Sequence, residues 1–399
     1  MKIAKFQDID VTAKDVVVRV DYNVPVKNGI IADDNRIRAT EKTVRHLLSK
    51  GCKVILISHM GRPKGTVVAE MSLKLLVPFV EEIMQAKVHF GSDCVGEEAK
   101  KAIAAAKKGE IVLLENLRFH AEEEKNDENF AKEIASYGEI FVQEAFGAVH
   151  RSHASTVAIT KFLPSYIGFL VQKELEFLDR AMDNPNRPFL AIIGGAKVSS
   201  KISVLNSLLD RIDMILIGGA MAYTFLRAQN ISAGTSLVEE DKIEDAKNII
   251  AKAYTKRVEC LLPADHVTVK ELSPDAEIKI TPAMAIPEDW MGVDIGTRTA
   301  SIFENAIQKA KTIFWNGPLG IFETDAYAKG SILVANALVR ATQQGAVTIV
   351  GGGDTLALLK KAGISLQSFS HCSTGGGASM EFLEGKKLPG LTALSQDEK

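Results

Sequence analysis

The stretch Ile349–Leu359, IVGGGDTLALL, joins an apolar run to a helical pattern through three consecutive glycines. A strand-to-helix turn needs at most one residue at positive φ, so three glycines indicate a backbone kept bare for close approach, as in loops that hold phosphate. The alternative is an ordinary tight turn in which Asp354 or Thr355 caps the helix. In either case the order strand, turn, helix is one that the rest of the chain repeats.

Eight apolar runs, of which this one is the last, alternate with helical patterns. Continuous rather than alternating apolar runs are typical of strands that helices cover on both faces. The predicted fold class is therefore α/β, with two Rossmann-like domains, each a mostly parallel sheet covered by helices, joined by an interdomain helix. The runs are VVVRVDY, KVILISH, IVLLEN, EIFVQEAF, FLAIIGGA, MILIGGA, TIFWNGP and VTIVGGG.

Length and composition are consistent with this interpretation. The 399 residues exceed what one hydrophobic core usually holds, which predicts two domains. A formal charge of only -2 gives no indication of a nucleic-acid surface. Neither a signal peptide nor a run of about 18 uncharged apolar residues occurs. We expect a cytoplasmic protein that binds neither nucleic acid nor a membrane.

The cysteines Cys52, Cys94, Cys260 and Cys372 lie far apart in the sequence. They show neither CxxC spacing nor a Cys/His cluster, so the spacing indicates neither a disulfide framework nor a zinc site. Each is expected to be a small hydrophobic residue of the core.

An amphipathic segment between the fourth and fifth runs marks the predicted domain boundary. Apolar residues recur there at helical spacing from Ile167 to Met182, and Pro185 and Pro188 end the pattern. The prediction is a first domain over 1–166, a connector helix and hinge over 167–185, and a second domain from 186 onward.

Four Gly-Gly loops follow predicted strands of the second half, whereas no two glycines are adjacent in the first 165 residues. Ligands of parallel sheets lie at these strand ends, so the loops favour a polyphosphate receptor. Neither GxGxxG nor a Walker A motif occurs. Instead, GGAKVSSK predicts Lys197 and Lys201 on one face of the following helix, where Lys201 is alternatively a solvated surface lysine. Asp354 is predicted to cap its helix, to bind Mg2+, or both.

Several strand ends and one loop of the first half carry basic and amide side chains and an aspartate instead. Several arginines converging on one edge suit a small anion with phosphate and carboxylate groups, because a guanidinium binds both bidentately. For any single arginine an exposed salt bridge is the alternative, and His120 and His150 are either ligands or satisfied loop residues. The candidates are Asp21, Asn23, Arg36, His59, Arg62, Arg118 and Arg151.

Taken together, these motifs resemble the phosphoglycerate kinase family from end to end. The resemblance implies that the first domain binds 3-phosphoglycerate, that 186–383 binds Mg-ATP or Mg-ADP, and that about 384–399 packs back on the first domain. The motifs include RVDYNVP, DDNRIRA, SHMGRPKG, LLENLRFHAEEEKND, EAFGAVHRSHAS, IIGGAKVSSKI, IGGAMAYTFL, WNGPLGIFE, VGGGDT and STGGGASMEFLEGKKLPG.

The resemblance also implies roles for individual residues. The substrate-binding residues would be Asp21, Tyr22, Asn23, Arg36, His59, Met60, Gly61, Arg62, Arg118 and Arg151. The nucleotide-binding residues would be Lys197, Lys201, Gly292, Asn316, Glu323, Gly352, Gly353, Asp354 and Thr355, with Asp354 also the ligand of Mg2+. The catalytic residues would be Arg36, Lys197, Gly352 and Gly376.

The implied reaction is reversible in-line transfer of the γ-phosphoryl of ATP to the carboxylate of 3-phosphoglycerate, with domain closure in a monomer. The carboxylate is already ionised at pH 7, so no general base is needed. The alternatives are a kinase for another small acid or phosphosugar, and a nucleotide-binding regulatory module without catalysis. The chain departs from the usual family pattern at Lys42, Gln143, Glu144, Ser152 and Thr297.

Overall fold

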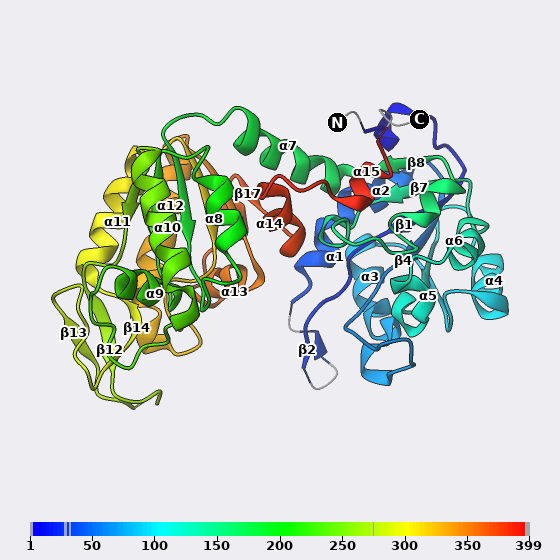
Figure 1. The fold of residues 1–399 in the computed structure, drawn as a ribbon. Helices are drawn as coiled ribbons and strands as arrows, with labels where there is room; N and C mark the ends of the chain where they lie inside the picture. Colours follow the sequence, from blue (N-terminus) through cyan, green and yellow to red (C-terminus); the bar gives the residue numbers. More distant parts are fainter. Residues whose placement is uncertain (1–2, 28–29, 32, 274, 396–399) are drawn as a thin grey trace. The chain divides into compact units, whose positions relative to one another are not determined.

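A computed structural model describes residues 3–27, 30–31, 33–273 and 275–395 (Figure 1). The chain forms two compact units, Met1–Glu176 with Lys387–Lys399, and Phe177–Lys386. The division falls within helix α7 (Phe169–Asp183). The prediction that the helical segment begins at Ile167 is wrong, because Ile167 pairs with Gln143 as the last residue of a strand.

Unit 1 is built on a sheet of six parallel strands in the order β5-β6-β4-β1-β7-β8. The four inner strands coincide with the four apolar runs predicted in this half. The strands are β5 (Val88–Gly91), β6 (Ile111–Leu114), β4 (Lys53–Ile57), β1 (Asp15–Arg19), β7 (Ile140–Gln143) and β8 (Ser165–Ile167), beside a two-stranded ribbon of β2 (Val26–Lys27) and β3 (Ile30–Ile31).

Helices cover both faces of this sheet, as the continuous apolar runs predict. Val16 and Val18 of β1 pack in a core with α1, α2 and α3, whereas Val17 packs in a second core with α4 and α6. The helices are α1 (Asn35–Ala39), α2 (Glu41–Ser49), α3 (Val77–Met84), α4 (Gly96–Ala105), α5 (Ala121–Glu124), α6 (Glu128–Ala135) and the C-terminal α15 (Pro389–Thr392).

The C-terminal segment packs on unit 1 through α15. The Gly390 N–H donates to the Val149 carbonyl at 2.8 Å, and Ser395 bridges to Ile3. Residues 396–399 of the segment predicted to pack there lie outside the described residues.

Unit 2 repeats the architecture with six parallel strands in the order β11-β10-β9-β15-β16-β17. Ile192 and Trp315 of the inner strands pack with Phe303 of α11 and Leu338 of α12. The strands are β11 (Glu259–Leu261), β10 (Met214–Ile217), β9 (Phe189–Ile193), β15 (Thr312–Asn316), β16 (Val347–Gly351) and β17 (His371–Cys372), and the helices are α8 (Ile202–Leu208), α9 (Met221–Ala228), α10 (Ile243–Thr255), α11 (Thr297–Lys309), α12 (Lys329–Gln343), α13 (Gly353–Lys361) and α14 (Gly377–Leu383).

The eight apolar runs do not include the outer strands of the two sheets, although β17 precedes the Gly-Gly loop of CSTGGGAS, which was predicted to follow a strand. These strands have two to four residues and are partly exposed, so they carry no continuous apolar run. An antiparallel sheet of β13 (Lys279–Thr281), β12 (His266–Val269) and β14 (Met291–Ile295) was also missed. The apolar-run criterion therefore found the buried strands and overlooked short or half-exposed ones.

No helix in the described part of the chain is long and apolar enough to span a membrane.

The four cysteines, all within the described residues, form no disulfide, and Cys52 and Cys94 are buried as expected. Cys260 and Cys372 are only partly buried, so the prediction that every cysteine is a core residue is wrong for these two.

Candidate active site

The carboxyl edge of the unit 1 sheet gathers the basic residues predicted from the sequence. Strands β6, β4, β1 and β7 are neighbours, so the segments that follow them emerge side by side. Hydrogen bonds join these segments. The Gly61 N–H donates to Asn23 Oδ1 at 2.9 Å, and Arg118 Nη1 donates to the Gly61 carbonyl at 2.8 Å. The structure thus brings together residues that lie far apart in the sequence.

Arg36 is held at this edge by two contacts. Its Nη1 donates to Asp21 Oδ2 at 2.8 Å and to the Asn23 carbonyl at 3.2 Å. Asp21 is buried, whereas a third of the Arg36 side chain is exposed. Asp21 therefore orients the guanidinium while leaving part of it available to a ligand.

Several positive charges crowd the edge around His59. Burial and the charges of Arg19 and Arg118 lower the pKa of His59 well below its usual value, so the imidazole is neutral at pH 7. Burial, together with Arg151 and Arg19, also lowers the pKa of Arg118 to about 10. Such mutual repulsion is relieved when an anion binds among the cations.

The remaining predicted residues of this edge differ in exposure. Arg62 is exposed, and Arg151 is partly exposed and donates from Nε to His150 Nε2 at 3.1 Å. Met60 is buried, and its N–H donates to the side-chain oxygen of Asn116, in the loop after β6. Tyr22 is fully buried, with its hydroxyl 2.9 Å from Thr40 Oγ1, so it belongs to the core beneath the edge.

A buried ion pair supports this edge, and the sequence analysis missed it. Arg19 and Glu123 are fully buried, with Arg19 Nη2 3.9 Å from Glu123 Oε1, and both side chains hydrogen-bond to Ser155. Burial opposes ionisation of Glu123, but nearby His153, whose Nδ1 lies 3.7 Å from Glu123 Oε1, and the charge of Arg19 outweigh it and lower its pKa. An arginine inside the apolar run VVVRV was the available signal for Arg19. Nothing in AEEEK distinguishes Glu123.

Glu144, one of the departures from the family pattern, is also buried. Its Oε1 accepts hydrogen bonds from Thr43 Oγ1 and from the Leu170 N–H in the first turn of α7, the latter at 3.0 Å. Its Oε2 lies against Gly168, where an added Cβ would be only 2.1 Å away. Burial raises the pKa of Glu144 to about 7. The longer side chain thus fits because residue 168 is glycine.

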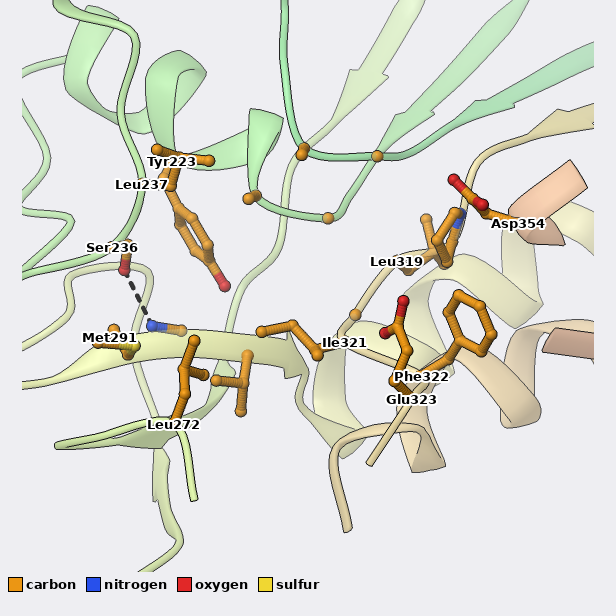
Figure 2. Close-up of a pocket in the computed structure, with 18 residues that line it drawn as sticks. Tyr223, Ser236, Leu237, Leu272, Met291, Leu319, Ile321, Phe322, Glu323 and Asp354 are labelled. Carbon is orange, nitrogen blue, oxygen red and sulfur yellow. Dashed lines mark hydrogen bonds between the residues drawn. The ribbon is translucent and has the colours of Figure 1, made fainter. Parts of the chain in front are cut away.

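Two adjoining pockets lie at the carboxyl edge of the unit 2 sheet. The apolar pocket, of about 430 Å³, is shown in Figure 2 and is walled by residues such as Tyr223, Leu237 and Met291. The glycine pocket, of about 360 Å³, is walled by the glycine loops after β9, β15, β16 and β17. Both pockets are lined by Gly195, Ala196, Pro318 and Asp354, so they are continuous.

The predicted nucleotide residues are distributed over these pockets. Gly292 and Glu323 line the apolar pocket, and Asp354 lines both. Lys197 is exposed and lines neither pocket. The others line the glycine pocket, and they are Lys201, Asn316, Gly352, Gly353, Thr355 and Gly376.

The prediction that Lys197 and Lys201 share a helix face is wrong, because α8 begins only at Ile202. Ser199 starts a turn instead, with its N–H and hydroxyl both donating to the Glu239 carboxylate at 3.0 and 2.6 Å. Lys201 stands at the start of the helix, and its ammonium donates to Asn316 Oδ1 at 2.5 Å. Burial lowers the pKa of Lys201, while the charge of Asp354 opposes this shift.

The prediction that Asp354 or Thr355 caps helix α13 is also wrong. Gly352 is the N-cap, at φ +96°, and no side chain makes a capping hydrogen bond. Thr355 is buried and instead accepts a hydrogen bond from the Gly317 N–H at 2.8 Å. Asp354 is exposed in the first turn of the helix and lines both pockets.

The apolar pocket contains wall residues that the sequence analysis did not identify. The Tyr223 side chain lies beside Gly292, where an added Cβ would be 1.9 Å from the Tyr223 hydroxyl oxygen. Ser236 Oγ accepts from the Gly292 N–H at 2.9 Å, as Figure 2 shows. Tyr223 was within the quoted motif IGGAMAYTFL, but only the fold places it opposite Gly292.

Comparison with known proteins identifies the family. Residues 6–386 match the family model described as phosphoglycerate kinase. The chain belongs to the phosphoglycerate kinase family. It is 59% identical over 394 residues to a phosphoglycerate kinase of Elusimicrobium minutum, covering 99% of each chain. It is 50% identical over 396 residues to a relative named phosphoglycerate kinase 3, cytosolic, of Arabidopsis thaliana, covering 99% of this chain and 98% of the relative.

Solved structures agree with this family assignment. The structure of phosphoglycerate kinase from Coxiella burnetii matches with a TM-score of 0.87 at 36% identity and full coverage of both chains. That from Pyrococcus horikoshii matches with a TM-score of 0.87 at 31% identity over 98% of each chain. The α/β fold of two parallel six-stranded sheets is therefore that of phosphoglycerate kinases.

The titration of Glu144 predicts how stability depends on pH. Its pKa is about 7 in the folded protein and about 4.3 when unfolded, so the folded state binds the proton more tightly. The free energy of unfolding should therefore fall by on the order of 3 kcal/mol as pH rises between these values. Glu144→Gln keeps an acceptor for Leu170 and should flatten this fall, measured by thermal unfolding at about pH 5 and about pH 8.

The matched control for this change is Glu139→Gln, which removes a half-exposed carboxylate paired with Lys14 at 3.7 Å in the same unit. That variant should keep the wild-type slope. An equal slope in Glu144→Gln and wild type would contradict a titrating Glu144.

Proposed function

We propose that this chain transfers the γ-phosphoryl of ATP reversibly to the carboxylate of 3-phosphoglycerate, forming ADP and 1,3-bisphosphoglycerate. The family membership supports this reaction. The observation that carries the residue assignment is the contrast between the two carboxyl edges. One gathers guanidinium groups, and the other combines bare glycine backbone with an apolar pocket. A substrate with phosphate and carboxylate groups suits the first, and a nucleotide suits the second.

In unit 1, the arginines and His59 would bind 3-phosphoglycerate. Arg36 is oriented by Asp21. Burial and the charges of Arg151 and Arg19 disfavour the charged form of Arg118, and a bound anion would offset this effect. Exposed Arg62 and partly exposed Arg151 extend the positive surface at the same strand ends. Tyr22, Met60 and Gly61 would act mainly by shaping the edge, since two of them are buried and the third bonds to Asn23 and Arg118.

In unit 2, the apolar pocket would hold the adenine and ribose, and the glycine pocket would hold the phosphates. An apolar cavity with few polar groups is typical of a nucleobase site. The glycine pocket lies at the start of α13, where N–H groups point out of the helix and attract anions. Lys201, bonded to Asn316, would supply a fixed positive charge beside the phosphates.

The residues present fit Mg2+ delivered with the nucleotide. Mg2+ usually keeps several waters and takes one or two carboxylates with phosphate oxygens. Asp354 offers an exposed carboxylate that lines both pockets, beside the proposed phosphate site. When bound, the ion would neutralise charge on the phosphate oxygens.

Catalysis would rest on positioning and charge. The accepting carboxylate is ionised at pH 7, so no residue has to remove a proton. Arg36 and Lys197 would stabilise the transferred phosphoryl group, with N–H groups at Gly352 and Gly376 binding its oxygens. Because the two ligands are assigned to different units, direct transfer also requires the domain closure that the resemblance implies. A monomeric state and a cytoplasmic location stay predictions.

A coupled assay with 3-phosphoglycerate, ATP and Mg2+ tests the proposal directly. Turnover that requires all three supports it. Turnover only with another small acid would favour a related kinase, and nucleotide binding without turnover would favour a regulatory module.

Replacing Arg62 tests the assignment of the phosphoglycerate to unit 1. Arg62→Ala should weaken 3-phosphoglycerate binding by about tenfold, the loss of one charge-assisted contact, and leave Mg-ADP affinity unchanged, as measured by calorimetry. Arg38→Ala is the matched control, because it removes a half-exposed arginine of the same unit that pairs with Asp34 at 2.8 Å. Equal losses for both ligands would refute the division of labour.

Substitution of Gly353 tests whether the glycines of this loop are needed for ligand binding or only for the turn. An added Cβ there meets nothing within 4 Å and needs no positive φ, so Gly353→Ala should fold with unchanged or higher stability. If phosphate lies against this backbone, the methyl should still weaken ADP binding with and without Mg2+. Asp354→Asn should weaken only the Mg2+-dependent part. Nucleotide titrations with Mg2+ and with a chelator measure both.

The comparison variant is Gly352→Ala, which adds strain at φ +96° and a Cβ 2.9 Å from Asn316 Nδ2. It should lower stability by about 1 kcal/mol or more. If Gly353→Ala binds ADP with wild-type affinity, the glycines of the GGGDT segment serve only to form a turn and do not bind the ligand.

Lys197 is predicted to act on the transition state. Lys197→Ala should lower kcat far more than it raises KM for ATP, because a cation on the moving phosphoryl group is felt most in the transition state. Lys247→Ala, which removes a half-exposed lysine of α10, should leave both constants unchanged. An unchanged kcat with a raised KM would limit Lys197 to nucleotide binding.

A further inference from the structure

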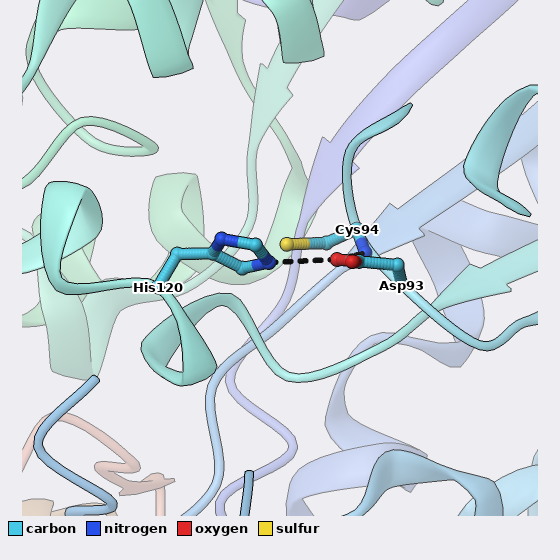
Figure 3. A group of neighbouring side chains, drawn as sticks. All are labelled: Asp93, Cys94 and His120. Carbon is cyan, nitrogen blue, oxygen red and sulfur yellow. Dashed lines mark hydrogen bonds and ion pairs between the residues drawn. The ribbon is translucent and has the colours of Figure 1, made fainter. Parts of the chain in front are cut away.

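Asp93, Cys94 and His120 form a cluster of three different metal-ligating groups in unit 1 (Figure 3). One ligand atom from each residue lies within 4.8 Å of the others. His120 Nε2 and Asp93 Oδ1 are 2.7 Å apart, and the Cys94 thiol points toward the same space. None of these residues belongs to the proposed phosphoglycerate or nucleotide sites.

The parallel sheet explains how residues so far apart in sequence meet. Asp93 and Cys94 follow β5, whereas His120 follows β6 and the short helix Leu117–Phe119. Because β5 and β6 pair in parallel, both segments leave the sheet at the same edge. Sequence spacing alone gave no sign of this cluster.

Burial leaves the cluster closed on one side and open on the other. Cys94 is fully buried, whereas the side chains of Asp93 and His120 are 41% and 29% exposed. The Phe130 ring packs on the His120 imidazole, with centroids 5.4 Å apart, and fixes its orientation. The thiol is thus anchored in the core while the imidazole and carboxylate lie along a route from solvent.

The surroundings of the cluster are acidic. Burial raises the pKa of the Cys94 thiol well above its usual value, and the charges of Asp93 and Glu123 add to this, so without a cation the thiol stays protonated. The hydrogen bonds that Asp93 accepts from the Cys94 and Val95 N–H groups and from His120 all fall on Oδ1. Its Oδ2 therefore remains available as a ligand atom within the described residues.

We propose that Asp93, Cys94 and His120 bind a soft divalent cation of the zinc class. Zinc takes sulfur, nitrogen and oxygen ligands in tetrahedral geometry, and water from the exposed side would complete the four. Mg2+ prefers oxygen ligands and is not expected to compete. On binding, the Cys94 thiol releases its proton to solvent, and the proton on His120 Nε2 moves to Nδ1 through solvent, so that Nε2 can bind the metal in place of Asp93. The ion would join the two loops and take no part in phosphoryl transfer.

Cobalt titration of the nucleotide-free full chain tests this proposal, because a thiolate bound to Co2+ gives a characteristic charge-transfer absorption. The absorption should appear in wild type, be lost in Cys94→Ser and be displaced by Zn2+. Zn2+ affinity should fall at least about tenfold in Cys94→Ser and in His120→Gln. Cys52→Ser is the matched control, since Cys52 is also buried in unit 1, and it should bind as wild type does.

Thermal unfolding gives a second readout. Because the shift caused by Zn2+ is measured within each variant, a variant with a lower unfolding temperature can still be compared. Zn2+ should raise the unfolding temperature of wild type and of Cys52→Ser, but not of Cys94→Ala, which keeps an apolar group at the buried position. No charge-transfer absorption in wild type, or an absorption that persists without the Cys94 thiol, would overturn the proposal.

Discussion

Every strand of an all-parallel sheet ends at the same edge, and this constraint governs both units. A parallel neighbour can be reached only by a crossover, so the segments that leave the carboxyl edge come from distant parts of the chain. In unit 1 the loops after four adjacent strands supply the cationic edge, and in unit 2 the loops after β9, β15, β16 and β17 enclose one pocket. The hydrophobic cores on the two faces keep the strands, and therefore the loops, in fixed register.

Under the proposed function, the two edges would bind anions in opposite ways. Unit 1 concentrates charged side chains, and it must stabilise them without a ligand. Fully buried Arg19 would cost several kcal/mol if it were unpaired, and Glu123 and Ser155 compensate for it beneath the surface. Unit 2 uses few charges and exposes backbone N–H groups instead, which need no counterion. Repulsion among the cations of unit 1 would favour binding of an anion, whereas binding in unit 2 would depend on the shape of the pockets.

The sequence predicted the eight inner strands because full burial on both faces requires continuous apolar runs. Apolar runs alone could not predict the outer strands, whose short, half-exposed segments lack that pattern. For the site, strand-end residues such as Asn23 and Asn316 could be proposed from position alone, whereas Arg36 lies in helix α1 and reaches the edge through its contact with Asp21. The turn that separates Lys197 from its helix could not be predicted, because Glu239, forty residues away, stabilises it. The Cys94 cluster likewise depends on strand pairing and not on spacing.

The glycines of the unit 2 loops have two different structural reasons for lacking a side chain. At Gly194 an added Cβ would lie 2.2 Å from the Pro318 carbonyl oxygen, and at Gly317 it would lie 2.2 Å from the Gly194 carbonyl oxygen. These glycines let the loops after β9 and β15 touch backbone to backbone. At Gly353, by contrast, an added Cβ would meet open space, so packing gives no reason for a missing side chain. The contact between these two loops forms part of the wall of the glycine pocket. Only a glycine such as Gly353, whose missing side chain packing does not explain, can be explained by a ligand that binds in the pocket.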